Sequence, residues 1–511
     1  MQPTTTRQPF SRQKLQDLLK QEDALFERQH PKSRALFERA QASLHGGVPM
    51  NWMVKWASPF PLFVKEGKGA HFTCADDHKY LDFCLGDTGA MTGHAPDAAV
   101  KAIIERVSRG TTFMLPSEDS IVVAEELKKR FKLPYWQTAL TATDANRFVI
   151  RLARMITGRP YVLVMNWCYH GTVDESFATL SGDKVVARKG NMGPPVDPAL
   201  TTRVVEFNDL DALKKALADK QVACVLAEPA MTNIGIIHPD PGYHEALRQI
   251  TRETGTLLVI DETHTICTGP GGYTAAHGLE PDFITIGKPI ASGIPASAYG
   301  FSESVAKLIQ SKSNIDDCDT GGIGGTLAGN TLAMAAMRVT LTEILTQAAY
   351  DITIPLAKHF TDGVEAVIKE YELPWIVKQL GCRAEYWFRP EPPHNGSEAA
   401  AAADAELDRY MHLFALNRGI LMTPFHNMAL IAPATTTQDI DQHTAVFKES
   451  VETLLGKKSL LADCGRSQSW RRRPDLVFIL WTNKDKAGMD LTNKRYQYGF
   501  DLAHASRSGS P

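Results

Sequence analysis

Two residues of opposite charge stand where buried strands are expected to end. Asp261 closes the apolar run TLLVID (256–261), and Lys288 closes the run FITIGK (283–288). Ligands of parallel sheets bind outside the carboxyl ends of the strands, so both side chains are expected at the ligand-binding edge of a sheet. An aspartate at a strand end is by itself more often a cap or turn residue. A carboxylate and an amine together indicate a ligand that needs both groups.

Pyridoxal phosphate (PLP) is a ligand that needs both. Its pyridinium nitrogen stays protonated when a buried carboxylate faces it, and Asp261 is predicted to be that carboxylate. Its aldehyde binds a lysine whose amine is partly neutral, and Lys288 is predicted to supply it. Its phosphate binds N–H groups at a helix N-terminus, for which the segment TATDANRF, with Ala142 and Thr143, has the right composition. Tyr169 offers a flat side chain to cover the ring.

Further polar residues are expected near the same edge. Glu228 follows the apolar run ACVLA, and His170 comes shortly after YVLVM (161–165). Both are candidates for contact with the cofactor. Two alternatives remain open, because Glu228 at a strand end can serve only to tie its loop and His170 can be a core residue with satisfied hydrogen bonds.

The elements around these residues indicate an α/β fold. From about Pro116 to Ser304, near-continuous apolar runs alternate with helical stretches such as 242–253. This alternation is typical of a mostly parallel, doubly wound sheet that is covered on both faces. The fold therefore favours a ligand site at the strand ends, where Asp261 and Lys288 are expected.

Changes in the pattern divide the chain into four predicted segments. One or two surface helices, broken near Pro31, are followed by short strands at about 62–64, 70–73 and 80–83. Helix and strand alternate again from 345 to about 455, and the periodicity is then lost. The predicted segments are 1–115 for N-terminal helices and small-domain strands, 116–344 for a PLP-binding large domain, 345–455 for a C-terminal small domain and 456–511 for a poorly ordered tail.

Composition and charge narrow the class of protein. The 511 residues carry a formal net charge of -3, which gives no global field favouring nucleic acid or an anionic membrane, so a small-molecule partner is expected. The sequence contains no run of 18 apolar residues, so no membrane span is predicted. The eight cysteines fit no zinc pattern and are expected to be reduced thiols. The N-terminus lacks the apolar stretch of a secretion signal, which favours a cytoplasmic location and leaves a mitochondrial presequence as the alternative.

Six motifs, in order along the chain, resemble those of the class III (ω-type) aminotransferases, the group that includes glutamate-1-semialdehyde aminomutase. The resemblance covers about residues 46–455 and implies PLP fold-type I, a homodimer with shared active sites, and Thr326 as a ligand of the neighbouring subunit's phosphate. The motifs are Thr141–Ala145 at the phosphate turn, Tyr169-His170-Gly171, Glu228-Pro229, Asp261-Glu262, Ile286-Gly287-Lys288 and Gly325–Asn330.

Several positions depart from the family pattern. Ala142 and Asp144 replace the usual Gly and Glu of the phosphate turn, and Pro289 follows the lysine. His264 stands where the family usually has an apolar residue packed on the ring, and is predicted to stack on the ring or to hydrogen-bond its hydroxyl. With the segments NWCYHGTVDE (166–175) and TPFHNMALIAP (423–433), the chain resembles a divergent branch that contains an (R)-1-hydroxy-2-aminoethylphosphonate ammonia-lyase.

The resemblance implies a reaction in which Lys288 takes a proton from the carbon that bears the amine. Transamination of a small amine or amino acid is the first expectation. Ammonia elimination from a 1-hydroxy-2-amino compound and an aminomutase reaction use the same residues and stay as alternatives. Arg383 is a candidate clamp for a carboxylate or phosphonate, although a solvated or paired arginine is an equal alternative. A catalytically silent PLP-fold binding protein is the rival class, against which the presence of both Asp261 and Lys288 argues.

Overall fold

The computed structural model describes residues 8–312, 321–424 and 426–457. All of these belong to one compact unit. The predicted divisions after residues 115 and 344 therefore stay predictions. Most of the predicted tail, 458–511, lies outside the described residues.

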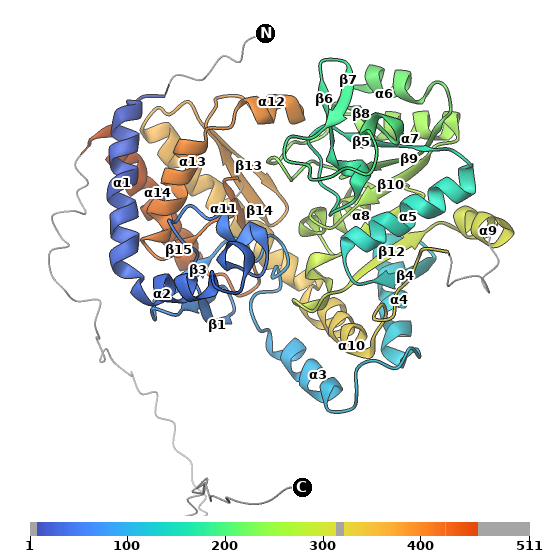
Figure 1. Ribbon diagram of the computed structural model, residues 1–511, viewed down its shortest axis with the longest axis horizontal. Helices are drawn as coiled ribbons and strands as arrows, with labels where there is room; N and C mark the ends of the chain where they lie inside the picture. Colours follow the sequence, from blue (N-terminus) through green and yellow to red (C-terminus); the bar gives the residue numbers. More distant parts are fainter. Residues whose placement is uncertain (1–7, 313–320, 425, 458–511) are drawn as a thin grey trace, which may run out of the picture. The chain divides into compact units, whose positions relative to one another are not determined.

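A seven-stranded mixed sheet organises the middle of the chain (Figure 1). Strand β12 runs antiparallel to both of its neighbours, and the other strands run parallel to one another. The α/β class and the mostly parallel sheet predicted from the alternating apolar runs are confirmed. In sheet order the strands are β4 (Tyr135–Ala139), β12 (Ser297–Phe301), β11 (Phe283–Ile286), β10 (Leu257–Asp261), β9 (Val222–Ala227), β5 (Tyr161–Met165) and β8 (Thr202–Val205).

Helices cover this sheet because their apolar faces need burial. Helix α5 packs against strands from β4 to β9, and α7 packs against β10. The outermost strand β8 also contacts a two-stranded hairpin, β6 (Ala178–Ser181) and β7 (Lys184–Ala187). The helices of this region are α4 (Glu118–Phe131), α5 (Ala142–Thr157), α6 (Leu210–Leu217), α7 (Tyr243–Thr254), α8 (Gly272–His277), α9 (Glu303–Lys312) and α10 (Thr331–Val339).

The N-terminal region begins with two helices and continues into a second sheet. Helix α1 (Arg12–Gln29) ends before α2 (Pro31–Ala40), which confirms the predicted break at Pro31. Strands β1 (Val64–Lys68), β2 (His71–Cys74) and β3 (Lys79–Asp82) form an antiparallel meander. The first strand begins later than predicted, at Val64, because Leu62 packs on the core without joining the ladder. Helix α3 (Asp97–Val107) follows.

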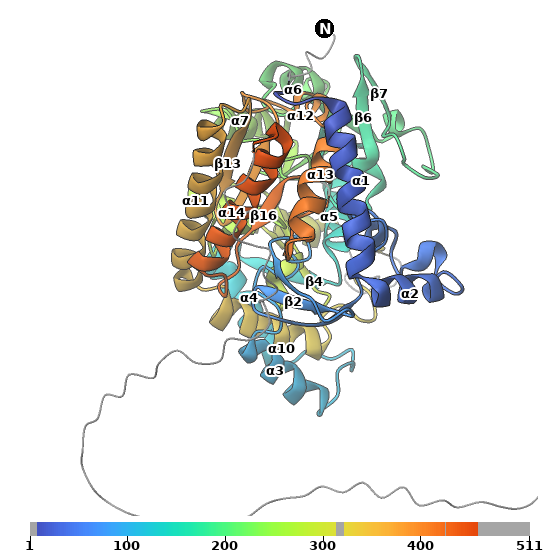
Figure 2. The same ribbon diagram turned by 90° about the vertical axis from the view of Figure 1, so that its left-hand side faces the viewer.

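The C-terminal region closes back on the N-terminal one. The short strand β15 (Ile420–Leu421) pairs in parallel with β3, and helix α1 lies along α13 (Figure 2). A separate three-stranded antiparallel sheet contains β13, β14 and β16. The elements are α11 (Gln347–Glu370), β13 (Ile376–Leu380), β14 (Arg383–Trp387), α12 (Gly396–Ala401), α13 (Ala405–Leu416), β16 (Met428–Leu430) and α14 (Thr437–Leu455).

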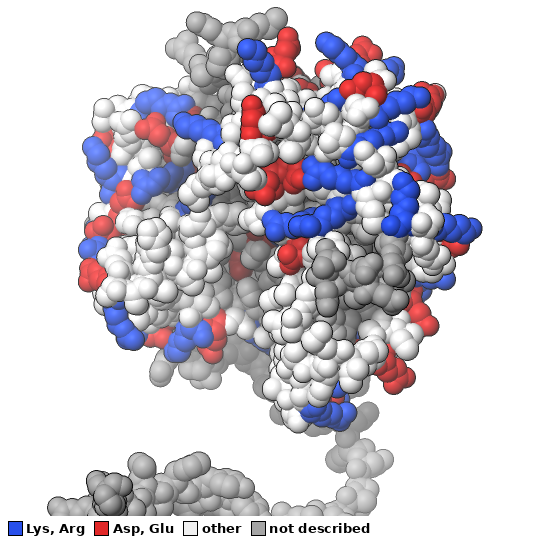
Figure 3. Space-filling model, turned by 45° about the vertical axis from the view of Figure 1, so that its right-hand side comes forward, with Lys and Arg blue, Asp and Glu red and all other residues white. Residues whose placement is uncertain are grey.

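Short helical turns link these elements, and two of them carry residues of the site described below. They are η1 (His45–Gly47), η2 (Asn51–Val54), η3 (Asp174–Phe177), η4 (Pro198–Leu200), η5 (Thr265–Thr268), η6 (Lys288–Ala291) and the π-helical turn η8 (Thr340–Ile344). On the face drawn in Figure 3, Lys and Arg are interspersed with Asp and Glu. Among the described residues, no helix is long and apolar enough to cross a membrane.

Helix α14 carries signals for both of its ends. Thr436 and Asp439 form a capping box at the N-terminus, and Gly456, with a φ of 72°, adopts the left-handed conformation that ends helices. The last described helix is therefore complete at Gly456 without any contribution from later residues.

We predict that a chain truncated after Lys457 folds and binds PLP as the full chain does. The reason is that α14 is capped by its own residues and buries Phe447, Val451 and Leu454 in the core. Thermal unfolding and PLP titration of the truncated and full-length proteins check this. A truncated protein that fails to bind PLP would place part of 458–511 in the fold.

Candidate active site

Three neighbouring parallel strands bring their polar end residues to one edge of the sheet. Strand β10 ends at Asp261, Glu228 follows β9, and Lys288 follows β11 by two residues. All three side chains line a cavity of about 400 Å³. The edge predicted from the apolar runs is therefore the wall of a cavity large enough for a cofactor-sized molecule.

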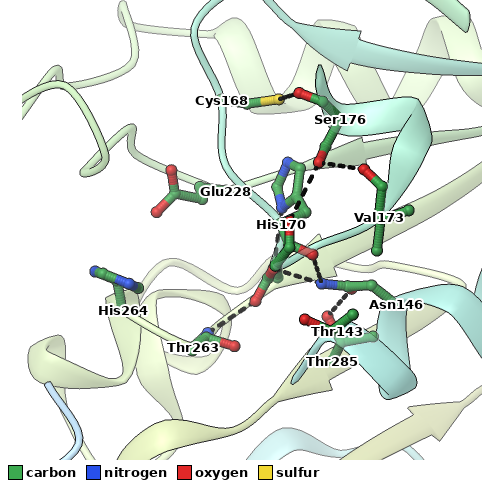
Figure 4. A network of polar contacts seen from close by, with 12 residues as sticks. Thr143, Asn146, Cys168, His170, Val173, Ser176, Glu228, Thr263, His264 and Thr285 are labelled. Carbon is green, nitrogen blue, oxygen red and sulfur yellow. Dashed lines mark hydrogen bonds and ion pairs between the residues drawn. The ribbon is translucent and has the colours of Figure 1, made fainter. Parts of the chain in front are cut away.

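Asp261 is held by a set of buried donors. Its Oδ2 accepts hydrogen bonds from Asn146 Nδ2 at 2.9 Å and His170 Nδ1 at 3.0 Å, and its Oδ1 accepts from the Thr263 backbone N–H at 3.0 Å. Asn146 is fixed in turn by the Thr285 hydroxyl, which donates to its Oδ1 at 2.6 Å. Figure 4 shows Asn146 and His170 in this network, with Glu228 and His264 to one side. The carboxylate is fixed in place from three elements.

The electrostatics keep Asp261 ionised. Burial raises its pKa, but the hydrogen bond and charge of His170, with the Thr263 and Asn146 donors, lower it to about 2. Burial opposes the charged form of His170, yet Cys168 and Asp261 raise its pKa above the ordinary value. A carboxylate has about four acceptor positions, and three are used here, so Asp261 can still accept from a donor in the cavity.

The N-terminus of helix α5 forms another wall of the cavity. Thr141 caps the helix through its hydroxyl, which accepts from the Asp144 N–H at 3.2 Å, and the Asp144 carboxylate accepts from the Thr141 N–H. Asp144 therefore has a structural role. Ala142 and Thr143 lie in the first turn and line the cavity, where helix N–H groups lack intrahelical partners and attract anions.

A close approach holds this helix against the loop after β5. The Thr143 hydroxyl accepts from the Thr172 N–H at 2.9 Å. Gly171 has a φ of 77°, and a Cβ added there would lie 2.2 Å from Thr143 Oγ1. Only glycine fits at this point, which accounts for the Gly in the sequence Tyr169-His170-Gly171.

Lys288 lies between an acid and an imidazole. Its Nζ donates to Asp87 Oδ2 at 2.8 Å and lies 2.5 Å from His264 Nε2. Its backbone has a φ of 45°, which a non-glycine residue rarely adopts. Strain of this kind clusters at functional sites, where the surrounding structure holds it in place.

The remaining cavity residues include two aromatic rings and an acid. Tyr169 packs edge-on against Trp52 with 5.6 Å between ring centroids, and burial and the charge of Asp87 raise its pKa to about 12. Glu228 accepts from the Thr232 hydroxyl and, at 3.3 Å, from the Thr232 N–H. Glu228 thus ties its loop and also lines the cavity, and its contact with the cofactor stays a prediction.

Three predicted site residues do not line this cavity. His170 is buried behind it, where its Nδ1 donates to Asp261, so its direct contact with the cofactor stays a prediction. Arg383 is fully buried on β14, and its Nη2 donates to the Thr88 hydroxyl at 2.5 Å. Thr326 lines a different cavity, of about 430 Å³, beside residues 112–116. The roles of Arg383 in substrate binding and of Thr326 in phosphate binding remain predictions.

Sequence reasoning missed several residues of the site, among them Thr263 and the three described next. Asp87 lies 201 positions before Lys288, and Trp52 comes from the N-terminal turn η2. Asn146 lies inside the segment identified for phosphate binding, but its side chain points to Asp261 from 115 positions away. A signal existed for Asp87, since it stands in the glycine-rich segment LGDTGAMTG (85–93), which is typical of a loop that approaches a ligand.

The cavity fits PLP on the observations above. Asp261 supplies an ionised, buried carboxylate with an acceptor position to spare, and Lys288 supplies an amine at the next strand end. The N-terminus of α5 supplies N–H groups for a phosphate. Thr263 Oγ1 and His264 Nδ1, both buried on cavity residues, have no hydrogen-bond partner among the described residues. A polar ligand is the natural partner for such atoms.

The model of the class III aminotransferases matches residues 52–451. The chain belongs to this family, and PLP is its cofactor. A glutamate-1-semialdehyde 2,1-aminomutase of Halalkalibacterium halodurans is 33% identical over 419 residues, which are 80% of this chain and 95% of that protein. One from Thermoplasma volcanium is 32% identical over 434 residues, which are 82% of this chain and 99% of that protein.

Solved structures agree with this assignment. A glutamate-1-semialdehyde aminomutase from Pseudomonas aeruginosa is 46% identical, with a TM-score of 0.86 over 87% of this chain and all of that chain. A lysine-to-alanine variant of it was solved in complex with PMP. An ω-transaminase from Sphaerobacter thermophilus is 27% identical, with a TM-score of 0.76 over 84% of this chain and 99% of that chain. The predicted family and fold are confirmed.

We predict that Asp261→Asn lowers the turnover rate by about 100-fold or more, because a neutral amide cannot hold the pyridinium proton and each 1.4 kcal/mol of barrier is about tenfold in rate. Steady-state kinetics on the PLP-loaded variant check this, with a thermal melt to verify folding. The exposed Asp441→Asn, which only disturbs a surface pair with His359, is the matched control. A rate within about threefold of wild type for Asp261→Asn would refute the role.

Proposed function

We propose that this chain is a PLP-dependent enzyme that moves the amino group of a small amino compound to a neighbouring carbon. The observation that carries the proposal is the placement of Lys288 and Asp261 in one cavity at adjacent strand ends. The similarity to glutamate-1-semialdehyde aminomutases, up to 46% identity, favours an aminomutase over the transamination expected from the sequence motifs.

Each residue of the cavity is proposed to have its own role in this reaction. PLP, when bound, supplies a sink for the electron pair left on the substrate carbon. Asp261 holds a negative charge where the ring nitrogen would lie, and the N-terminus of α5 would hold the phosphate through Ala142 and Thr143. Tyr169, Glu228 and His264 line the same cavity and would contact the cofactor when it is bound. Lys288 takes a proton from the amine-bearing carbon at Nζ and returns it elsewhere.

The enclosed position of Lys288 suits this task. Its side chain is about a quarter exposed, so few water molecules compete for the proton at Nζ. The contact with Asp87 aims the amine into the cavity. A base in a fixed position close to two neighbouring carbons can remove a proton from one and deliver it to the other.

The test is an assay of the holoenzyme on small amino compounds, beginning with glutamate 1-semialdehyde. It measures three things: the isomerised amino compound, the dependence on a keto acid, and the release of ammonia. The proposal predicts an isomerised amino compound without free ammonia and without a keto-acid acceptor, and predicts that Lys288→Ala abolishes it. The reference is the wild-type holoenzyme assayed in parallel. Strict dependence on a keto acid would replace the proposal by transamination. Sustained release of ammonia would replace it by the elimination that resemblance to the phosphonate ammonia-lyase suggests.

We further propose that the active form is a homodimer in which Thr326 serves the partner's site. Thr326 lies away from Lys288 in its own chain, in a cavity shared with the loop 112–116. In that loop Phe113 is 52%, Met114 77% and Leu115 69% exposed, an apolar surface that a second copy would cover.

We predict that light scattering shows a dimer and that Thr326→Ala weakens PLP binding by about 10-fold or more. A lost hydrogen bond to a charged phosphate costs about 1.5–3 kcal/mol, and 1.4 kcal/mol is about tenfold in affinity. Met114→Asp should give monomers with low activity, because it places a charge in the apolar surface. A monomer with full activity at the assay concentration would contradict the shared site.

A further inference from the structure

The amine of Lys288 is in contact with both a carboxylate and an imidazole. Asp87 Oδ2 accepts a hydrogen bond from Nζ at 2.8 Å, and His264 Nε2 lies 2.5 Å from the same nitrogen. Asp87 Oδ1 and His264 Nδ1 are buried and have no hydrogen-bond partner among the described residues. Both residues are thus directed at Lys288 rather than at a structural partner.

We propose that His264 is a second acid–base residue of this site, which exchanges a proton with Lys288 across the contact between Nε2 and Nζ while Asp87 stabilises the positive charge. The inference rests on the proposed function. It also differs from the stacking or ring-hydroxyl contact that the sequence suggests for His264.

The transfer moves one proton from Lys288 Nζ to His264 Nε2 and needs no other reactant. One N–H bond of the Lys288 ammonium breaks, and its electron pair stays on Nζ. The proton forms a new N–H bond at His264 Nε2, and the positive charge moves from the ammonium to the imidazole. Lys288 is then a neutral amine and can accept another proton, while the imidazolium of His264, which lines the cavity, can donate one to the substrate.

Charges around the pair support a neutral imidazole as the starting form. Burial and the charge of Lys288 lower the pKa of His264 well below its ordinary value. Burial raises the pKa of Asp87, but the charges of Lys288, His264 and Arg383 lower it overall. Around His264 the charged and titratable groups are Lys288, Arg383 and Asp261. Around Asp87 they are Lys288, Arg383, Tyr169, His426 and Cys84.

The backbone of Asp87, Thr88 and Lys288 is strained, which supports a functional role for the contact between Asp87 and Lys288. Asp87 has a φ of 48° and Thr88 a φ of 83°, so two successive non-glycine residues occupy the left-handed region. Lys288 shares this property, with a φ of 45°. Each such residue costs free energy, and the strain persists where the surrounding structure holds it in place. Here it brings Asp87 and Lys288 into contact.

A second acid–base residue changes which reactions the site can perform. Simple transamination moves one proton between two carbons, and a single lysine suffices. A reaction that also breaks or forms a bond at the neighbouring carbon needs a proton donor for the group that departs from it. His264 provides this donor beside Lys288, so the substrates predicted are amino compounds with a second amino, hydroxyl or oxo group on the adjacent carbon.

The experiment uses three variants of the holoenzyme. His264→Gln places near the position of Nε2 an amide that neither gains nor loses a proton in this pH range, and His264→Ala leaves room for free imidazole. Both are expected to retain PLP, seen by its visible absorbance, and to lose about 100-fold or more in turnover. Added imidazole is expected to restore part of the His264→Ala rate, which a packing role would not allow. The exposed His359→Gln is the matched control.

A readout independent of turnover uses the PLP-free protein. Asp87→Asn removes the carboxylate to which Nζ donates at 2.8 Å, so reductive methylation of Lys288, followed by peptide mass spectrometry, is expected to be several-fold faster than in wild type. The pH–rate profile gives a second check. Since His264 accepts the proton in its neutral form, the wild-type rate should fall at acidic pH as the imidazole protonates, and His264→Gln should lack this limb.

Two results would overturn the inference. One is His264→Gln with PLP bound and turnover within about threefold of wild type. The other is His264→Ala that holds PLP but is not restored by imidazole. Lys288→Ala separates this failure from failure of the proposed function. If Lys288→Ala keeps its turnover, the proposed function is wrong, whereas an inactive Lys288→Ala with an active His264→Gln removes only the role of His264.

Discussion

The ionised carboxylate of Asp261, buried at the end of β10, is the constraint on which the site depends. A buried charge is costly unless hydrogen bonds and an opposite charge compensate it. Asn146, His170 and the Thr263 N–H provide this compensation from α5, the loop after β5 and the turn after β10. The carboxylate therefore fixes the relative positions of three elements, and the same three elements line the cavity.

The sheet places the amine relative to this carboxylate. Strands β10 and β11 are adjacent and parallel, with Asp261 opposite Thr285, so Lys288 follows only three residues beyond that register position. The loop that carries Asp87 then joins from the N-terminal region, whose strand β3 pairs with β15 of the C-terminal region. The site thus combines the edge of the sheet with a strained loop. The loop supplies Asp87, which accepts a hydrogen bond from Lys288.

Local pattern was enough to predict the sheet edge and seven of the residues that line the cavity. Apolar runs locate strand ends, so Asp261, Lys288 and Glu228 followed from their neighbours in the sequence. The helix start at Ala142 followed from composition. Contacts between distant segments were beyond this reasoning, since no periodicity relates Asp87 to Lys288 or Asn146 to Asp261. For the same reason the sequence did not predict the contact between His264 Nε2 and Lys288, while the predicted ring contact of His264 stays a prediction.

The most direct test of the central claim is to locate the covalent bond between cofactor and chain. Borohydride reduction of the PLP-loaded protein would fix the cofactor on its lysine, and peptide mass spectrometry would identify that residue. The account predicts a single phosphopyridoxyl group on Lys288 and loss of visible absorbance with activity. Labelling of another lysine, or none in a protein that retains bound PLP, would contradict it.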